Sequence, residues 1–366
     1  TRAEYIERQR ALHGRRSVAV LPVHFPKPLL TALDVLSVEL WGPPGPPRGD
    51  AAGRLQPYVC AVGRNALAFL ASGGADAVDA VLFPHTCDTI QGLATLVTDL
   101  GGWSKRAFTF LHPRGLERPG VRAFLETELR ALAGGLEALS GRRLEPARLA
   151  AAIRLHDAID AERAALLDGR ARLDLSDPEL YALLRRGEWL WPEEHLAELR
   201  AARAARLREA AVQAGVPVLV SGYVPEPAGV LEALGGAGAY VAADDYAAVG
   251  RRVVRAARGD PQADPWGALV ERHLAAPPCP TRAADQASRL RWLEGLLDRS
   301  GARGVLLHLV KFCEPELFDV PAIKAAFTRR GVPVLVVEGE LEAALPAQVL
   351  TRIEAFVELL SSGRAA

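Results

Sequence analysis

The chain has 366 residues, of which 49% are hydrophobic and 24% are charged, a composition typical of a folded globular protein and not of a disordered or membrane-embedded one. Its 44 basic and 44 acidic residues cancel, and the arginines are spread along the chain, so nucleic acid is not an expected partner. No run approaches the roughly 18 apolar residues of a membrane span, and residues 1–16 form a charged helical pattern without an apolar signal core. We therefore expect a cytoplasmic protein without a membrane partner.

The first part of the chain alternates strand-like and helical segments. After the helical pattern of residues 1–16, five β-rich runs follow: Ser17–Val23, Ser37–Trp41, Tyr58–Val62, Ala80–Pro84 and Ala107–Leu111. Helical periods lie between them, at residues 65–72 and 89–100. This alternation predicts a parallel sheet covered by helices. The segment Gly42–Gly53 is rich in proline and glycine, which predicts a surface loop.

A helical connector is expected from about residue 119 to 205. Apolar residues recur there at three- and four-residue steps, as at Leu125, Leu129, Leu132 and Leu136. The residues Ser176, Pro178 and Glu179 have the spacing of a capping box and predict the start of a further helix.

Strand-like runs then resume and predict a second parallel sheet: Val216–Gly222, Ala239–Asp245, Gly304–Phe312 and Val332–Glu340. A long amphipathic helix is expected at residues 347–360. The length of the chain suits two units of 100 to 200 residues. We therefore predict two α/β domains with Rossmann- or flavodoxin-like parallel sheets, residues 1–205 including the connector and residues 206–366.

Three of the four cysteines are predicted to lie where a strand gives way to a helix. Cys60 and Cys87 belong to the first predicted domain and Cys313 to the second. Ligands of open parallel sheets bind at these carboxyl ends, so a shared ligand would lie in the interdomain cleft. Widely separated cysteines in a chain without an export signal argue against a disulfide framework. Structural zinc sites usually contain close Cys-x2-Cys pairs, which this sequence does not have, whereas iron–sulfur clusters accept scattered ligands.

Two long stretches carry a resemblance to a known family. FPHTCDTIQGL around Cys87 and HLVKFCEPELFDVPAIKAAFTRRGVPVLVVEGE around Cys313 resemble the 2-hydroxyacyl-CoA dehydratase and benzoyl-CoA reductase subunit family, of the 2-hydroxyglutaryl-CoA dehydratase D-component type. YVCAVGRNAL matches the family's first cysteine, at Cys60. Weaker similarity at Ser221–Pro227, at Val241–Asp245 and in the connector extends the resemblance over nearly the whole chain.

The resemblance implies one 4Fe-4S cluster held by Cys60, Cys87 and Cys313, with an open fourth iron site for water or a substrate oxygen. It also implies a separate ATP-hydrolysing iron–sulfur activator protein that sends one electron through the cluster into an acyl-CoA substrate, giving a ketyl radical that expels hydroxide. The sequence contains no GxxxxGK[ST] phosphate loop, so the activator is expected to be another protein. A paralogous second subunit, forming a heterodimer, is expected as well.

The leading hypothesis is therefore a dehydratase subunit, a lyase of anaerobic metabolism that removes water from a 2-hydroxyacyl-CoA. The alternatives are a subunit of a benzoyl-CoA reductase-type enzyme and a non-catalytic partner subunit that relays electrons. A bilobed ligand-binding protein is a further alternative, although its exported form needs a signal sequence. The acyl group cannot be predicted, because no CoA-specific motif is visible.

Two residues near the cysteines are candidates for catalysis. His85 lies two positions before Cys87 and could act as a general acid or base, or could be a hydrogen-bonded histidine at a strand end. Lys311 lies two positions before Cys313, where its charge could favour a thiolate, or it could simply reach solvent. The fourth cysteine, Cys279 in APPCPTR, is expected to be a packed thiol and not a ligand.

Other polar and aromatic residues have simpler expected roles. Arg64 could offset cluster charge or contact a CoA phosphate, or form a surface ion pair. The spacing of Asp88 and Gln91 is that of a capping box. Expected roles of the remaining residues are helix starts at Glu314 and Asp319, a loop position for His24, and a core or subunit interface for Trp189 and Trp191.

Overall fold

The computed structural model describes residues 1–43, 45, 53–100, 102–113, 118–256, 259–341 and 344–363. Most of the expected loop Gly42–Gly53 lies outside these residues. The described part contains two four-stranded parallel sheets among helices, which confirms the predicted α/β class.

The first sheet has the strand order β2-β1-β3-β4, formed by β1 Arg16–Val20, β2 Val35–Glu39, β3 Ala80–His85 and β4 Arg106–Leu111. All of its pairings are parallel. The helices of this part are α1 Arg2–His13, α2 Lys27–Ala32, α3 Ala61–Ala71 and α4 Asp88–Thr95, and a π-helical turn follows at Leu96–Leu100. The central strands β1 and β3 are buried on both faces, which explains their nearly continuous runs of apolar residues.

One predicted strand of this part is wrong. Residues 57–59 form a turn, and helix α3 begins directly after Cys60, so no strand spans Tyr58–Val62. The apolar residues of this segment belong to the buried face of the helix, on which Ala61, Val62 and Ala66 are covered. A five-residue apolar run fits the start of a buried helix as well as a short strand, and packing decides between them.

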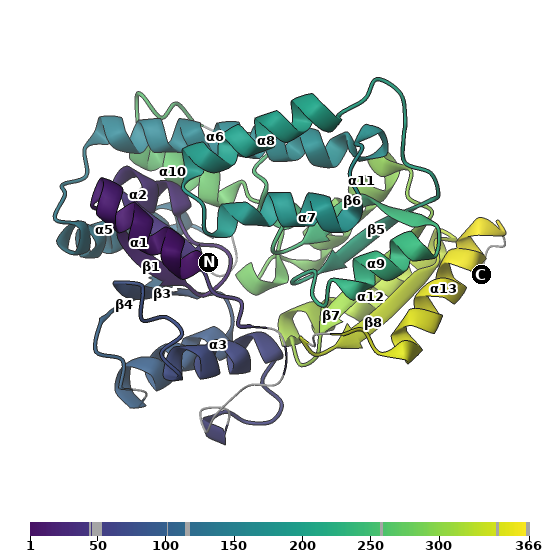
Figure 1. The fold of residues 1–366 in the computed structure, drawn as a ribbon, viewed down its shortest axis with the longest axis horizontal. Coiled ribbons are helices and arrows are strands. Elements are labelled where there is room, and N and C mark those ends of the chain that lie inside the picture. Colours follow the sequence, from purple (N-terminus) through teal and green to yellow (C-terminus); the bar gives the residue numbers. More distant parts are fainter. Residues whose placement is uncertain are drawn as a thin grey trace.

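The connector contains the four helices α5 Val121–Ser140, α6 Pro146–Asp168, α7 Asp177–Arg185 and α8 Pro192–Arg206. Helix α7 begins with the predicted capping box, because Ser176 Oγ accepts from the Glu179 N–H and the Glu179 carboxylate accepts from the Ser176 N–H. Helices α6 and α8 pack side by side along the upper side of the view in Figure 1 and extend across both sheets. The connector therefore links the two halves physically as well as in sequence.

The second sheet repeats the topology of the first, with the order β6-β5-β7-β8. Its strands are β5 Val216–Gly222, β6 Ala239–Tyr246, β7 Gly304–Val310 and β8 Val334–Gly339, and its helices include α9 Gly229–Gly236, α11 Gln286–Ser300, α12 Glu314–Arg329 and α13 Ala347–Ser361. Helix α10 Pro265–Leu274 instead packs on α5 and α6. The predicted boundary after residue 205 falls at the end of α8, and it stays a prediction.

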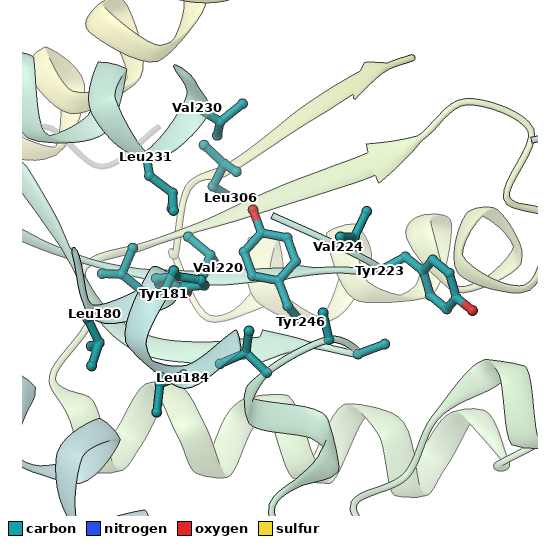
Figure 2. Packing of buried hydrophobic residues seen from close by; sticks show 14 of the residues in the cluster. Leu180, Tyr181, Leu184, Val220, Tyr223, Val224, Val230, Leu231, Tyr246 and Leu306 are labelled. Atoms are coloured by element: carbon teal, nitrogen blue, oxygen red, sulfur yellow. The ribbon is translucent and has the colours of Figure 1, made fainter. Parts of the chain in front are cut away.

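A single hydrophobic cluster joins the two halves. It includes Trp41 and Cys60 from the first sheet's side and Tyr223, Tyr246 and Cys313 from the second. Figure 2 shows part of this cluster, with the Tyr223 ring at its edge and its hydroxyl pointing away from Tyr246. The two sheets therefore meet through packed side chains close to the predicted cysteine site.

Candidate functional site

The strand order fixes where each sheet can bind a ligand. In the order 2-1-3-4, which the flavodoxin-like fold shares, the connections leave the first and third strands in opposite directions and open a crevice at their carboxyl ends. In the first sheet, His24 follows β1 and Cys87 follows β3. In the second, Tyr223 follows β5 and Cys313 follows β7. Two of the three predicted cysteines therefore lie at the two crevices.

Each of the three cysteines is the N-cap residue of a helix. Cys60 precedes α3, Cys87 precedes α4 and Cys313 precedes α12. Backbone N–H groups of the first helical turn act to lower the pKa of each thiol: those of Val62 and Gly63 at Cys60, of Thr89 and Ile90 at Cys87, and of Glu316 at Cys313. None of the three thiols forms a side-chain cap hydrogen bond. Helix N-termini stabilise negative charge, so these N–H groups partly offset the burial that otherwise disfavours a thiolate at all three positions.

Cys60 and Cys313 are buried, Cys87 is partly buried, and the three thiols are close enough to influence one another. Burial raises the pKa of Cys60 to about 11, and the nearby Cys87 contributes to the rise. Burial also raises the pKa of Cys313 well above its usual range, with additional repulsion from Cys60 and Cys87. Three thiols that repel one another when ionised would be stabilised by a shared cation or metal cluster.

The chemistry of this donor set, three cysteine thiols, is compatible with an iron–sulfur cluster. Among the described residues, no group of three or more His, Cys, Asp or Glu side chains could hold one metal ion. In a 4Fe-4S cluster each cysteine binds a different iron, which requires thiols that are near but not in contact. All four cysteines are free, so none of the candidate ligands is lost to a disulfide bond.

The structure adds Tyr223, a residue that the sequence did not identify. It is 4% exposed, and after burial the causes that raise its pKa are Cys87, Cys313, Cys60 and Cys279, in that order. Its ring packs edge-on against Trp41 at 5.4 Å. The only available signal was its position directly after a β-rich run, which does not distinguish a site residue from a core tyrosine.

A buried charge network lies behind Cys313 and Cys279. Arg251, which is fully buried, donates to the Asp245 carboxylate at 3.1 Å and to Glu316, in the first turn of the helix that Cys313 caps. Arg251 Nη1 also lies 3.4 Å from Cys279 Sγ. The network explains the VAADD segment, whose last residue, Asp245, anchors the arginine. It also confirms that Cys279 is a packed thiol, since its side chain is 0% exposed.

The two predicted catalytic residues have different surroundings. His85 is the last residue of β3, and its Nε2 forms a hydrogen bond with Gln91 Oε1. Lys311 is exposed, and its Nζ lies 5.0 Å from the centre of the Phe312 ring. Both flank the cysteine positions, and their catalytic roles stay predictions.

One helix-start expectation, at Asp319, is wrong, and one, at Asp88, is right about the helix start but wrong about the capping box. Helix α4 begins at Asp88 with Cys87 as its N-cap, so Asp88 and Gln91 do not form a capping box, and the Gln91 amide contacts His85 instead. Asp319 lies inside α12, which continues through Pro321. Packing of the buried Ile323 and Phe327 side chains offsets the hydrogen bond that the proline removes.

The remaining candidates mostly have the simpler of their expected roles. Arg64 pairs with Glu340 at 2.5 Å, an ion pair that joins α3 to the segment after β8. Trp191 is 6% exposed and belongs to the hydrophobic cluster around the first sheet, and Trp189 packs against that cluster, so both belong to the core. Glu314 is the first residue of α12, as expected. None of the helices in the described ranges is long and apolar enough to cross a membrane.

Comparison with known proteins identifies the family. A family model described as 2-hydroxyglutaryl-CoA dehydratase, D-component, matches residues 22–360. The chain is 25% identical to the lactoyl-CoA dehydratase subunit beta of Anaerotignum propionicum, over 95% of this chain and 92% of that one. It is 26% identical to a benzoyl-CoA reductase subunit of Thauera aromatica (88% and 85%) and 23% identical to the (R)-2-hydroxyglutaryl-CoA dehydratase subunit beta of Acidaminococcus fermentans (95% and 93%). The chain therefore belongs to the 2-hydroxyglutaryl-CoA dehydratase D-component family.

Proposed function

We propose that this chain is the 4Fe-4S subunit of an ATP-activated, radical 2-hydroxyacyl-CoA dehydratase, with Cys60, Cys87 and Cys313 as the cluster ligands. The observation that carries the proposal is that three mutually repelling thiols, two buried and one partly buried, each lie at the N-terminus of a helix. Family membership and the two similar dehydratase beta subunits support the reaction class.

When bound, the cluster would supply one-electron transfer and, with three cysteines for four irons, a Lewis-acidic position for a substrate oxygen. The chain's own residues would prepare the site. Backbone N–H groups of α3, α4 and α12 stabilise negative charge, and burial of the thiols excludes water. The Tyr223 hydroxyl has no hydrogen-bond partner among the described residues, so it is free to donate into the site. We propose His85, oriented by Gln91, as the residue that exchanges a proton with the substrate.

The proposal includes partners outside this chain. Each of the similar proteins is named as one subunit of an enzyme, so we expect a paralogous second subunit. We also expect an ATP-hydrolysing iron–sulfur activator and an acyl-CoA substrate, in the cytoplasm.

Metal analysis of anaerobically prepared protein tests the proposal. We expect about four iron and four sulfide per chain. Substituting Cys60, Cys87 or Cys313 with Ala should lower both contents, whereas the matched substitution Cys279→Ala should leave them unchanged. A wild-type protein that takes up no iron and sulfide would refute the cluster.

A reductase of aromatic acyl-CoA is the second candidate, because the benzoyl-CoA reductase subunit is as similar to this chain as the dehydratase subunits are. Incubation with activator, ATP and either 2-hydroxyacyl-CoA or benzoyl-CoA distinguishes loss of water from ring reduction. EPR spectra with and without acyl-CoA test whether this subunit binds substrate or only relays electrons, since only a substrate-binding cluster should change its spectrum.

A further inference from the structure

A second polar site lies at the carboxyl end of β1, in a cavity of about 110 Å3. Its walls come from the segment after β1, the end of β2, α6, the turn after β6, α10 and Arg282. One water takes about 30 Å3 in the liquid, so the cavity has room for a small polyatomic ion. None of the four cysteines lines it.

The lining of this cavity has an excess of positive charge. It contains five cationic side chains, those of Lys27, Arg163, Arg252, Arg272 and Arg282, and two carboxylates, Glu39 and Asp160. Each carboxylate is already shared between two of the cations. Glu39 pairs with Arg252 at 2.8 Å and with Lys27 at 3.8 Å. Asp160 pairs with Arg272 and, at 3.5 Å, with Arg163.

Arg282 is the cation that these carboxylates leave uncompensated. It is 3% exposed, and its Nη atoms donate only to the backbone carbonyls of His273, Ala276 and Pro277, at 2.7, 2.8 and 3.1 Å. Its Nε has no partner, and no carboxylate of the described residues lies within ion-pair distance. A buried guanidinium without a counter-charge is costly, so the fold retains a cation that an anion would stabilise.

His24 provides an unused hydrogen-bonding group at the same cavity. Its buried Nε2 has no partner among the described residues. The backbone of Val23 and His24 is left-handed, with φ of 65° and 57°, a conformation that is costly for a β-branched residue such as valine. Such strain concentrates at binding and active sites, where it orients side chains for a ligand. Burial and the nearby Arg282 hold the pKa of His24 well below its usual range, so the imidazole is neutral.

We propose that this cavity binds a small oxyanion, a carboxylate or phosphate group, which pairs with Arg282 and accepts a hydrogen bond from His24. Such a ligand supplies the counter-charge that Arg282 lacks and satisfies the free imidazole nitrogen. The Nε–H and one hydrogen of Nη1 are the N–H groups of Arg282 left for such an ion, because Nη2 already donates to two carbonyls. No cysteine lines the cavity, and the inference does not depend on the proposed cluster.

Isothermal titration calorimetry of the full chain tests this site, with sodium phosphate and acetate as ligands and sodium chloride as the reference at equal ionic strength. We expect saturable binding of one phosphate or one acetate per chain, and the anion that binds more tightly identifies the ligand as tetrahedral or planar. His24→Asn keeps a residue that tolerates the left-handed backbone and removes the imidazole. It should raise Kd at least tenfold, as should Arg282→Gln.

Arg203→Gln is the matched control, because Arg203 of α8 pairs with Glu162 of α6 and does not line the cavity. It should leave Kd unchanged. If Arg282→Gln fails to fold, His24→Asn alone decides the result. The inference is wrong if neither anion shows saturable binding, or if folded His24→Asn binds as tightly as the wild type.

Discussion

Asp245→Asn is the most informative test of the charge network behind the cysteine site. The Asp245 side chain is 0% exposed, and it accepts hydrogen bonds from Ser221 at 2.7 Å, Trp292 at 2.7 Å, Arg289 at 2.8 Å and Arg251 at 3.1 Å. Asparagine preserves the shape of the side chain but removes its charge. Arg251 and Arg289 would then remain buried with one carboxylate fewer. Arg251 would keep its ion pair with Glu316.

The size of the effect follows from burial and from the pKa. Burial alone would raise the pKa of Asp245, but Arg251 and Arg289 outweigh it and lower the pKa to about 2. At about 1.4 kcal/mol per pKa unit, the shift from 3.8 to about 2 corresponds to about 2–3 kcal/mol of stability for the ionised form. Breaking one partner of a buried ion pair costs about 3–5 kcal/mol, because the other charge is left uncompensated. We therefore expect Asp245→Asn to lower the free energy of unfolding by about 3–5 kcal/mol at pH 7.

The sign of the pH dependence is part of this prediction. Because the pKa is lower in the folded state than in the unfolded state, the contribution of Asp245 is fully present above about pH 4 and is lost as the pH falls towards 2. The difference between the wild type and Asp245→Asn should therefore shrink over that range.

Urea denaturation followed by circular dichroism measures this difference. The control is Asp298→Asn, because Asp298 pairs with Arg330 at the surface and its side chain is 59% exposed. Exposed pairs contribute about 1 kcal/mol or less, so the control should change little. If Asp245→Asn destabilises the protein no more than the control does, the buried network does not stabilise the second domain as we infer.

Three further changes test the site and the junction of the two halves. Tyr223→Phe keeps the ring contact with Trp41, so Tm and iron content should be preserved. The EPR spectrum should change, because the variant lacks the hydroxyl. An identical spectrum would show that the hydroxyl does not reach the cluster. Burial raises the pKa of Asp244 to about 7, so the free energy of unfolding should fall as the pH rises from 4 to 7. Asp244→Asn removes the titrating group and should flatten the dependence of Tm on pH over this range. An unchanged slope of Tm against pH would contradict the assignment. Arg64→Gln should cost about 1 kcal/mol or less by urea denaturation, with a smaller effect in high salt, since its pair with Glu340 is partly exposed; a salt-independent loss would argue against an ionic contribution.

The sequence predicted most of the fold because most of its strands, apart from β4 and β8, are buried on both faces. Such strands are continuous apolar runs, and the predicted run Val216–Gly222 coincides with β5. Local patterns were less reliable where tertiary packing competes with them. Pro321 indicated a helix start, yet the buried face of α12 carries the helix through it. The Tyr58–Val62 run likewise contains the start of helix α3 instead of a strand.

The sequence located the cysteines but could not describe their surroundings. Spacing placed Cys87 and Cys313 after strands, and the parallel-sheet rule brought them to the carboxyl ends. Nothing local indicated that Tyr223 lies among the cysteines or that Arg251 is buried behind Cys313 and Cys279. These contacts join residues from different strands and loops, so they depend on how the two halves pack.

The repeated strand order explains why the site needs both halves of the chain. Each sheet has one crevice, and neither crevice alone offers three thiols: Cys87 lies at the first, Cys313 at the second, and Cys60 at the helix that follows the loop after β2. Contacts across the junction hold them together, including the Trp41–Tyr223 ring pair and the bidentate Arg252–Glu39 ion pair. A group bound by all three thiols would therefore also bind the two halves to each other. Loss of that group should destabilise their junction before it destabilises either sheet, because the strand hydrogen bonds lie within each sheet and not between the two.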